Sequence, residues 1–413
     1  MPTEPLSLEL SELVAARDRI RGAITRTMQW PNDSLSEEFG VPLSLKLENL
    51  QRTGSFKLRG ATHKIGRLLD DGAARQGVIA ASAGNHAQGV ARAAAQAGLR
   101  AVVVMPTNAP LTKIVACRKL GAEVHLVGDT LEVAADEARR LADAEQLAFI
   151  HPYDDRDVIA GQASCALEMF EDAPDMTLAI VPLGGGGLIS GVALALKLQN
   201  PAIRVVGVQT ETVAPWRRFL RDGSLEEVPP GAHTVADGIR VKRPGVLTRQ
   251  VVARYVDEIV TVDDNAIAEA IVALLERTRT IGEGAGVVGL AALMQRKIRL
   301  RADERAVVVI SGGNIDMTLV GRSIDYGLAS SGRLMSVAVT ISDAPGQLLA
   351  LLKTVAELGM NVRHVEHRRG ELHVPVGMTE VILQIETRDL EHQHALLTHF
   401  FEQGLRVRNL LAS

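Results

Sequence analysis

The sequence is poor in aromatic residues and carries no strong net charge of either sign. Phe, Trp and Tyr make up 3% of its 413 residues, too few for the stacking surfaces that bind single-stranded nucleic acid. The 45 Lys and Arg residues are balanced by 49 Asp and Glu residues, which gives a net charge of -4 at pH 7. This balance argues against nucleic acid or a membrane surface as the main partner.

Cysteine and long apolar runs are also scarce. The two cysteines, Cys117 and Cys165, lie far apart without metal-ligand spacing, so we expect two buried, reduced thiols and no metal site. No run of 18 apolar residues is present, and the first residues lack the basic and apolar segments of a secretion signal. We therefore expect a cytoplasmic protein without a membrane span.

Short apolar runs that alternate with helical patterns are the main positive feature of the chain, which is 46% apolar and has 37 glycines. The runs of Val, Ile and Ala are continuous rather than alternating, which is typical of strands covered on both faces. Strand–helix repetition of this kind predicts an α/β fold with mostly parallel sheets. Strands are predicted at residues 78–81, 101–105, 123–127, 148–150, 178–181, 204–208 and 306–310.

The pattern changes in the last quarter of the sequence. Residues 323–334 are small and polar, as in a linker. Residues 335–413 then predict the order β-α-β-β-α-β of a ferredoxin-like unit. We therefore expect a large domain over residues 1–322, with a smaller subdomain at about residues 50–155 inserted in it, followed by a separate C-terminal domain.

One lysine stands in an unusual local setting, at the end of the stretch 53–57. Gly54 permits a tight turn, and Ser55 is a good N-cap for the helix expected to follow. Lys57 would lie in the first turn of that helix, next to Phe56. Apolar surroundings remove solvation from an amine, so the neutral form becomes accessible near neutral pH and can form a Schiff base with an aldehyde.

Four consecutive glycines at residues 184–187 follow the predicted strand 178–181 and precede a helical pattern. Consecutive backbone N–H groups at a helix N-terminus form a concave site for an anion. The stretch lacks the lysine of a nucleotide-binding P-loop and does not match the G-x-G-x-x-G dinucleotide motif. The sequence therefore predicts a phosphorylated ligand that is not a nucleotide.

Two further glycine-containing stretches also follow predicted strands, and parallel strands bring their carboxyl ends to one edge of a sheet, where ligands bind. Taken alone, the asparagine of the first stretch could simply cap a helix, and the serine of the second could belong to an ordinary turn. The first stretch is Ser82-Ala83-Gly84-Asn85-His86 and the second is Ser311-Gly312-Gly313-Asn314.

Together these stretches resemble the pyridoxal-phosphate enzymes of fold type II, the tryptophan-synthase-β type, and within them the threonine dehydratases, also called threonine ammonia-lyases. The resemblance covers about residues 10–325. It rests on the stretches above and on two more, Ala236-Asp-Gly238-Ile and Glu283-Gly-Ala-Gly286. It implies a catalytic domain of two subdomains that binds pyridoxal 5′-phosphate.

The resemblance also assigns roles to individual residues. Lys57 would form the Schiff base with the cofactor, and the glycines 184–187 would bind its phosphate. Asn85 would contact the 3′-oxygen of the cofactor, and Ser311 would contact its pyridine nitrogen. The residues expected at the cofactor are Lys57, Phe56, Asn85, Gly184, Gly185, Gly186, Gly187, Gly238, Glu283 and Ser311. Those expected at the substrate are Ser82, Ala83, Gly84, Asn85 and His86.

The implied reaction is a β-elimination from an amino acid. The substrate displaces Lys57 from the cofactor, and the freed amine removes the α-proton. Because Ser311 is neutral, it cannot keep the pyridine nitrogen protonated, so the carbanion would be short-lived and would expel the β-hydroxyl. Threonine would give 2-oxobutanoate and ammonia, and serine would give pyruvate and ammonia.

Related functions stay open beside this one. Serine racemases of this fold carry a second serine at the position of Ala83, and a methyl group cannot transfer protons, so we expect little racemisation. They also bind a divalent cation through a glutamate where this chain has Gln209, with Glu211 two residues further on, and no metal is assigned. The main substrate could also be serine or 3-hydroxyaspartate, or the chain could be a regulatory protein without activity.

The C-terminal unit resembles an ACT regulatory domain, on the loop stretches Asp343-Ala-Pro-Gly346-Gln-Leu and Gly359-Met-Asn361-Val. The resemblance implies allosteric control by a branched-chain amino acid such as isoleucine or valine. Asp343, Gly346 and Asn361 are the candidate effector residues. A unit that only mediates oligomerisation is the alternative, and we expect a homodimer or a homotetramer.

Overall fold

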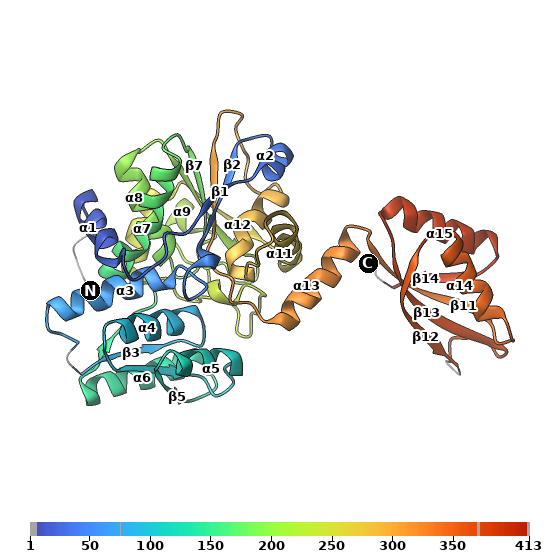
Figure 1. Cartoon of the computed structure of the whole chain (residues 1–413), viewed down its shortest axis with the longest axis horizontal. Helices are drawn as coiled ribbons and strands as arrows, with labels where there is room; N and C mark the ends of the chain where they lie inside the picture. The colour runs from blue at the N-terminus through green and yellow to red at the C-terminus, as the bar shows by residue number, and fades with distance from the viewer. Residues whose placement is uncertain (1–5, 75, 370–371, 411–413) are drawn as a thin grey trace. The chain divides into compact units, whose positions relative to one another are not determined.

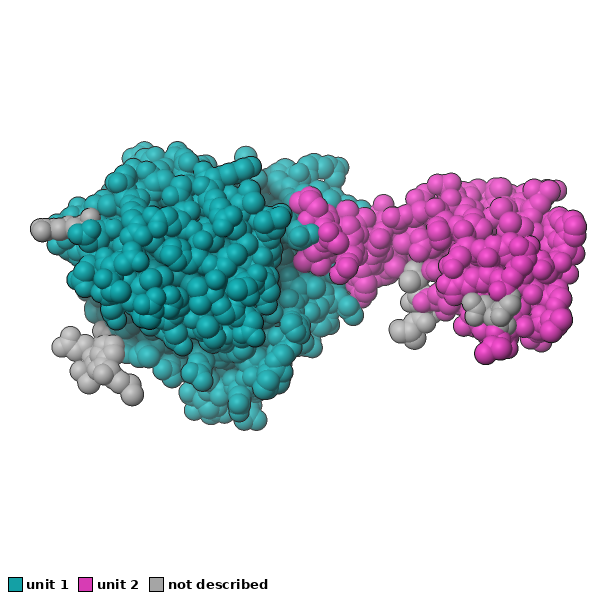
Figure 2. Space-filling view, turned by 90° about the horizontal axis from the view of Figure 1, so that it is seen from below, with its two compact units in different colours: residues 1–316 teal, residues 317–413 magenta. Residues whose placement is uncertain are grey.

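The computed structural model describes residues 6–74, 76–369 and 372–410 (Figure 1). The chain divides into two compact units, Met1–Asp316 and Met317–Ser413, which Figure 2 colours separately. The outermost residues of the two expected domains, before residue 6 and after residue 410, lie outside these ranges. Within the described ranges, no helix is both long and apolar enough to cross a membrane.

The larger sheet of the first unit has six strands. They are β1 (Gln29–Pro31), β2 (Leu43–Leu47), β7 (Leu178–Pro182), β8 (Arg204–Thr210), β9 (Glu258–Val262) and β10 (Ala306–Ile310). Their order across the sheet is β1-β2-β10-β7-β8-β9. Strand β1 pairs with β2 antiparallel, and every other neighbouring pair is parallel, which confirms the predicted mostly parallel sheet.

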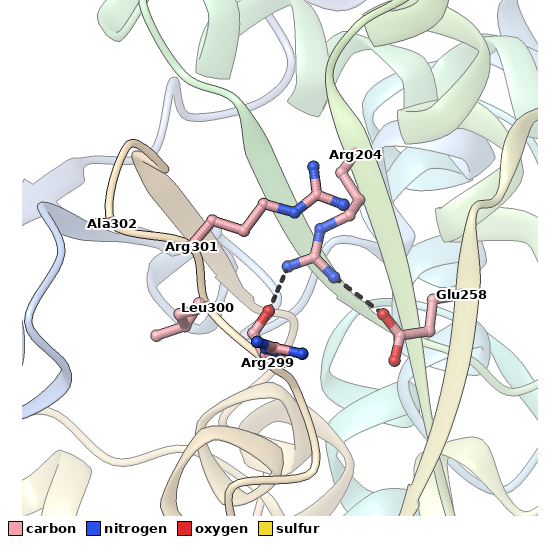
Figure 3. Close-up of a pocket in the computed structure, with 6 residues that line it drawn as sticks. All are labelled: Arg204, Glu258, Arg299, Leu300, Arg301 and Ala302. Carbon is pink, nitrogen blue, oxygen red and sulfur yellow. Dashed lines mark hydrogen bonds and ion pairs between the residues drawn. The ribbon is translucent and has the colours of Figure 1, made fainter.

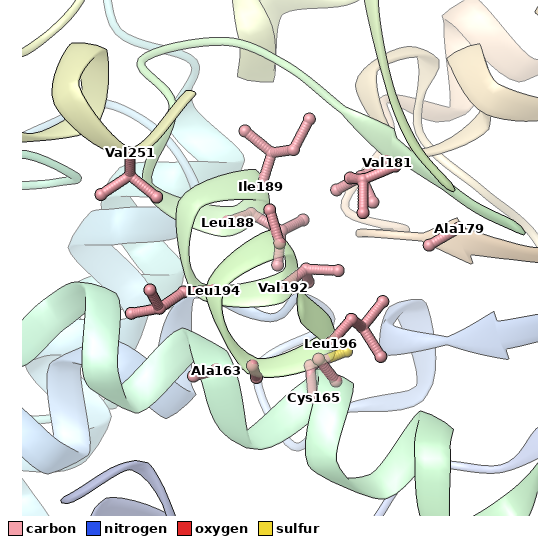
Figure 4. Packing of buried hydrophobic residues seen from close by; sticks show 14 of the residues in the cluster. Ala163, Cys165, Ala179, Val181, Leu188, Ile189, Val192, Leu194, Leu196 and Val251 are labelled. Atoms are coloured by element: carbon pink, nitrogen blue, oxygen red, sulfur yellow. The ribbon is translucent and has the colours of Figure 1, made fainter. Parts of the chain in front are cut away.

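Helices cover both faces of this sheet. Leu178 and Ile180 of β7 pack into one core, whereas Ala179 and Val181 pack into another on the opposite face. Figure 4 shows the second core, in which helix α8 packs its apolar side chains against β7 and helix α7. Burial on both faces explains why the strands are continuous apolar runs. The helices are α7 (Arg156–Asp172) and α8 (Gly187–Gln199) on this face and α11 (Asp264–Thr278) and α12 (Gly284–Met294) on the other.

A second, smaller sheet is formed by the strands predicted between residues 78 and 150. Its four strands run in the order β5-β4-β3-β6, and all pairs are parallel. Helices α4 and α5 share one core with the sheet, and helix α6 packs on its other face. The elements are β3 (Val78–Ala81), α4 (Asn85–Gln96), β4 (Ala101–Met105), α5 (Leu111–Lys119), β5 (Glu123–Leu126), α6 (Leu131–Glu145) and β6 (Ala148–Phe149).

Helix α3 (Lys57–Asp70) begins at the lysine singled out in the sequence. Gly54 has a φ of 71° and provides the expected tight turn before it. The expected Ser55 cap is wrong, because Phe56 occupies the N-cap position. Ser55 instead forms an isolated antiparallel β-bridge with Gly312, so the backbone of this turn pairs with the segment that follows β10.

A buried network of four charged side chains anchors α3. Arg59 donates to both carboxylate oxygens of Glu48, at 2.8 and 2.7 Å, and to both of Glu168, at 2.8 Å each. Lys46 also donates to Glu168, at 2.7 Å. All four side chains are buried. The network joins β2, α3 and α7, and so fixes the helix that carries Lys57.

The sequence did not indicate strands β1, β2 and β9. Strand β2 interrupts its apolar run with the buried Lys46, and β9 is a half-buried edge strand with a weak apolar pattern. The other elements of this unit are α1 (Leu10–Ile20), α2 (Asp33–Phe39), α9 (Phe219–Asp222), α10 (Val246–Tyr255) and two 3-10 turns, η1 (Glu48–Leu50) and η2 (Asp237–Ile239).

The second unit contains the predicted β-α-β-β-α-β order. Its antiparallel sheet has the strand order β12-β13-β11-β14, which is that of a ferredoxin-like fold. A core of residues from the sheet and both helices lies on one face. The elements are β11 (Leu334–Ser342), α14 (Gln347–Glu357), β12 (Asn361–Arg368), β13 (Met378–Glu386), α15 (Leu390–Glu402) and β14 (Arg406–Asn409).

The segment expected as a linker, residues 323–334, is not irregular. Most of it belongs to helix α13 (Met317–Ser330). Val320, Ser323 and Gly327 are its buried positions, and this spacing of three and four residues is helical. The small polar residues of the segment concealed this pattern in the sequence.

Close packing of α7 and α8 predicts a destabilising effect for Gly191→Ala. A Cβ atom at Gly191 would lie 2.6 Å from the Ala163 nitrogen and 2.7 Å from the Ile159 carbonyl oxygen. Backbone atoms cannot yield as a side chain can, so we expect the free energy of unfolding to fall by about 1–3 kcal/mol. Chemical denaturation followed by circular dichroism measures this change. Gly321→Ala in α13 meets no atom within 4 Å and is the matched control. It should leave stability unchanged or raise it by up to about 1 kcal/mol, and an equal loss in both variants would contradict the packing argument.

Candidate active site

The carboxyl ends of β3, β7 and β10 carry the three stretches singled out in the sequence. Ser82 follows β3, the glycine loop (residues 184–187) follows β7, and Ser311 follows β10. The Phe56 amide donates to the Ser311 carbonyl at 3.1 Å, which brings the turn before Lys57 against the end of β10. The structure therefore gathers these segments at one edge of the sheets.

Lys57 lies at this edge with its amine turned toward backbone oxygen. Its Nζ donates to the Pro152 carbonyl at 2.8 Å and lies 5.2 Å from the centre of the Phe56 ring. Burial lowers the pKa of the amine to about 8, and the negative charge of Glu283 opposes this only in part. A substantial fraction of the amine is therefore neutral at mildly alkaline pH, as a Schiff-base lysine requires.

Asn85 is held in place by a chain of hydrogen bonds from four segments. Its Nδ2 donates to Glu283 Oε1 at 2.6 Å, and its Oδ1 accepts from Asn314 Nδ2 at 2.8 Å. Asn314 Nδ2 also donates to the Thr53 carbonyl at 2.7 Å. Lys113 of α5 donates to the Asn314 carbonyl at 2.6 Å. These bonds fix the orientation of the Asn85 amide relative to the turn that precedes the lysine helix.

Glu283 is the buried acidic group of the site. Burial and the nearby Asp237 raise the pKa of its carboxyl to about 7, whereas Lys113 and the hydrogen bond from Asn85 act in the opposite direction. Its Oε1 also lies 3.4 Å from the position that a Cβ atom would take at Gly238. The protonated form of this carboxyl is therefore accessible near neutral pH.

Two carbonyl groups of the glycine loop accept hydrogen bonds from side chains of the protein. Trp216 Nε1 donates to the Gly184 carbonyl at 2.8 Å, and Thr248 Oγ1 donates to the Gly185 carbonyl at 2.9 Å. Gly186 has a φ of 96°, a left-handed conformation that favours glycine. Within the described residues, no protein oxygen accepts a hydrogen bond from the loop amides. The loop therefore offers several free donors at the N-terminus of α8.

A tyrosine covers the same loop. Cβ atoms at Gly185 and Gly187 would lie 2.4 and 2.8 Å from side-chain atoms of Tyr153. Gly185 and Gly187 must therefore lack side chains for two reasons: Tyr153 packs against them, and an anion must be able to reach their amides. Ser190, in the first turn of α8, is fully buried, and its Oγ has no hydrogen-bond partner among the described residues. An anion bound at the loop amides would supply the missing acceptor.

The stretch 82–86 forms the entry to helix α4. Ser82 Oγ accepts a hydrogen bond from the Gly84 amide at 3.1 Å. Ala83 and Gly84 are half-buried. His86 Nε2 lies 2.9 Å from the Ile150 carbonyl, and burial, aided by the charge of Lys57, lowers the pKa of its imidazole to about 3. The ring is neutral at physiological pH, so His86 holds the loop to the end of β6 rather than transferring protons.

The candidate effector residues of the second unit do not come together. Asp343 and Gly346 follow the end of β11, and Asp343 accepts from Arg369 Nε at 3.0 Å. Asn361 begins β12 and pairs with Glu386, which also pairs with the first residue of β11. The two groups therefore lie at opposite ends of a nine-residue strand.

Several residues of the site gave no functional signal in the sequence. Asn314 stood within a motif but had no role, and Lys113 is one of many lysines in the chain. Tyr153, Trp216 and Thr248 lie far along the sequence from the glycines that they contact. The chain has only three Tyr and two Trp, and this rarity is the one sequence feature that could have drawn attention to Tyr153 and Trp216.

The chain is similar to known proteins over most of its length. An L-threonine ammonia-lyase of Thermotoga maritima is 45% identical over 97% of this chain and 99% of its own length. Among solved structures, a threonine deaminase from T.th. is 38% identical with a TM-score of 0.71, and a maize serine racemase is 33% identical with a TM-score of 0.72. They cover 75% and 76% of this chain and 99% and 96% of their own chains, respectively.

The family model described as pyridoxal-phosphate dependent enzyme matches residues 20–312. These residues span both sheets of the first unit, the glycine loop, Lys57 and Ser311. The match extends over more than half of the chain, and the Thermotoga maritima relative aligns over nearly all of it. The chain therefore belongs to the family of pyridoxal-phosphate dependent enzymes.

Proposed function

We propose that this protein is a threonine ammonia-lyase, which converts L-threonine to 2-oxobutanoate and ammonia and also acts on L-serine to give pyruvate. The observation that carries the proposal is the half-buried Lys57, whose amine has its pKa lowered to about 8, at the same sheet edge as Asn85 and the glycine loop. The name of the Thermotoga maritima relative supports the choice of substrate.

The residues present fit pyridoxal phosphate. The free amides of the glycine loop and the unpartnered Ser190 hydroxyl suit its phosphate, and Lys57 suits its aldehyde. Asn85 and Ser311 would contact the ring at its 3′-oxygen and its nitrogen. When bound, the cofactor stabilises negative charge at the substrate α-carbon. A carboxyl group at the ring nitrogen would favour a long-lived carbanion, whereas Ser311 is neutral and favours rapid loss of the β-hydroxyl.

Lys57 would act as the base that removes the α-proton. Its pKa of about 8 lies near the working pH, which is the condition under which a general base is most effective. The segment 82–86 would bind the substrate carboxylate at the N-terminus of α4. Glu283 keeps the Asn85 amide oriented through a 2.6 Å hydrogen bond. These groups would hold one face of the α-carbon toward the lysine.

Racemisation is the second candidate activity, since a serine racemase is among the similar structures. It needs a second acid or base on the face opposite the lysine. Ala83 lies in the carboxylate-binding segment and carries only a methyl group. Among groups near the segment, His86 is held neutral by its low pKa and is bound to a backbone carbonyl. We therefore assign β-elimination as the main reaction.

The first test replaces Lys57 with Ala and follows 2-oxobutanoate formation from threonine. Loss of the base and of the Schiff-base amine should reduce kcat by at least about a thousandfold. A substrate panel of threonine, serine and 3-hydroxyaspartate should show the highest kcat/KM for threonine. Lys119→Ala, on the surface of α5, is the matched control and should keep full activity. Equal activity of both variants would refute the role of Lys57.

A second test uses the pH dependence of stability in the cofactor-free protein. At about pH 7 the native state holds the partly desolvated ammonium group of Lys57, whose pKa has fallen from 10.5 to about 8. This shift corresponds to at most about 3 kcal/mol. Lys57→Met should therefore raise the free energy of unfolding at about pH 7 by up to about that amount, as measured by urea denaturation.

The advantage of the Met variant should shrink at alkaline pH. Between pH 8 and 10.5 the unfolded chain binds a proton that native Lys57 has released, so the stability of the unmodified protein rises with pH in this window. The exposed control Lys119→Met should show no such pH-dependent difference from the unmodified protein. A constant difference between Lys57→Met and the unmodified protein from about pH 7 to about pH 10 would contradict the lowered pKa.

We also propose that the second unit is an ACT regulatory domain of a cytoplasmic homo-oligomer that serves isoleucine biosynthesis. Its ferredoxin-like order and its loop stretches support this assignment. The solved threonine deaminase covers 75% of this chain and 99% of its own, so about a quarter of this chain is additional to the fold they share. Isoleucine or valine is the proposed effector, with the loop around Asp343 and Gly346 as its contact; Asn361 lies at the other end of β11 and would not touch the same ligand within one unit.

Calorimetric titration of the full-length enzyme with isoleucine and valine tests the effector proposal. Asp343→Ala removes a carboxylate that can bind the effector amino group and should weaken binding by about tenfold. The exposed Lys353→Ala on α14 is the control and should bind normally. If neither amino acid gives a heat of binding or changes the rate of the enzyme, the effector proposal is wrong, and the second unit would serve only in assembly.

A further inference from the structure

A pocket lies at the opposite edge of the larger sheet from Lys57, and Figure 3 shows the residues that line it. Arg204 is the first residue of β8, Glu258 is the first of β9, and the loop 299–302 precedes β10. Because these strands are parallel, all three positions belong to the amino-terminal edge of the sheet. The cavity has a volume of about 580 Å³, within the range of sites for small ligands. It is therefore separate from the catalytic site at the carboxyl ends of the strands.

Arg204 forms a fixed wall of this pocket. Its Nη1 pairs with Glu258 Oε2 at 2.8 Å, and its Nε donates to Glu304 Oε1 at 2.9 Å. Its Nη2 donates to the Arg299 carbonyl at 3.0 Å, and this bond connects the loop to β8. The Arg204 side chain is only 14% exposed. This wall of the pocket is therefore preformed.

Two further guanidinium groups of the pocket are not neutralised. Arg299 and Arg301 are exposed, and neither guanidinium has a hydrogen-bond or ion-pair partner in the part of the chain that the structure describes. Figure 3 shows the side chain of Arg301 extending toward Arg204. Like charges repel, so this convergence has an electrostatic cost unless an anion lies between them. With Glu258 in its lining and Glu304 bound to Arg204, the pocket has three guanidinium groups for two carboxylates, which leaves a positive excess.

We propose that this pocket binds a small phosphate-bearing anion. The planar guanidinium group binds phosphate oxygens through two parallel N–H donors, and converging arginines can hold two sides of one phosphate. Arg299 and Arg301 supply the free donors, while Arg204 adds positive charge from the fixed wall. Leu300 and Ala302 add a small apolar surface for the rest of a phosphate ester. The site is independent of the proposed catalytic activity.

Isothermal titration of the holoenzyme with inorganic phosphate tests the proposal. The bound cofactor blocks the glycine loop, which would otherwise bind phosphate itself. The double variant Arg299→Gln/Arg301→Gln should weaken phosphate binding at least about tenfold at constant ionic strength. The control Arg118→Gln/Lys119→Gln removes two exposed charges from α5 and should leave the affinity unchanged. A parallel titration with methyl phosphate distinguishes a site for free phosphate from one for a phosphate ester.

A third variant gives a change of opposite sign. Glu258→Gln removes a negative charge from the pocket wall and should tighten phosphate binding severalfold.

Because Arg299 and Arg301 are exposed and make no side-chain hydrogen bonds among the described residues, their replacement should not alter the thermal midpoint of unfolding. Unchanged affinity in the arginine double variant, or equal heat from sodium chloride at matched ionic strength, would overturn the proposal.

Discussion

Four buried charges determine where the reactive lysine stands. Arg59 is the second residue after Lys57, and its guanidinium makes paired hydrogen bonds to Glu48 and Glu168. Lys46 shares Glu168 and balances the charge of the group. Breaking such a network by removing one partner costs about 3–5 kcal/mol, because the remaining charge is left buried and unpaired. The first turn of α3 therefore has one permitted position relative to β2 and α7.

That position explains the other contacts at the site. With α3 fixed, the turn before it forms a bridge with Gly312, and the amine of Lys57 reaches the Pro152 carbonyl. Pro152 lies next to Tyr153, which covers the glycine loop. A displacement of α3 would thus be transmitted to the lysine and, through the segment 152–153, to the anion site. The residues of the network are not catalytic groups themselves, but their ion pairs limit the positions that the catalytic groups can take.

The sequence predicted those parts of the molecule that local chemistry determines. Continuous apolar runs predicted the buried strands, and glycine stretches after them predicted where backbone amides stand free. It did not predict Lys46 inside a strand, because its partner Glu168 lies 122 residues away. It also assigned the cap of α3 to Ser55, since the competing bridge with Gly312 forms only in the folded chain. The sequence also assigned no role to Tyr153 and Asn314, because their contacts at the site form only in the folded chain.

Burial acts on the lysine and the acid of the site in opposite directions. It lowers the pKa of Lys57 to about 8 and raises that of Glu283 to about 7, so both pKa values move toward neutral pH. A close ion pair between them would reverse both shifts and keep the amine charged. The carboxylate instead accepts a hydrogen bond from Asn85. Because Asn85, and not the amine of Lys57, lies against the acid, Lys57 can lose its proton at mildly alkaline pH.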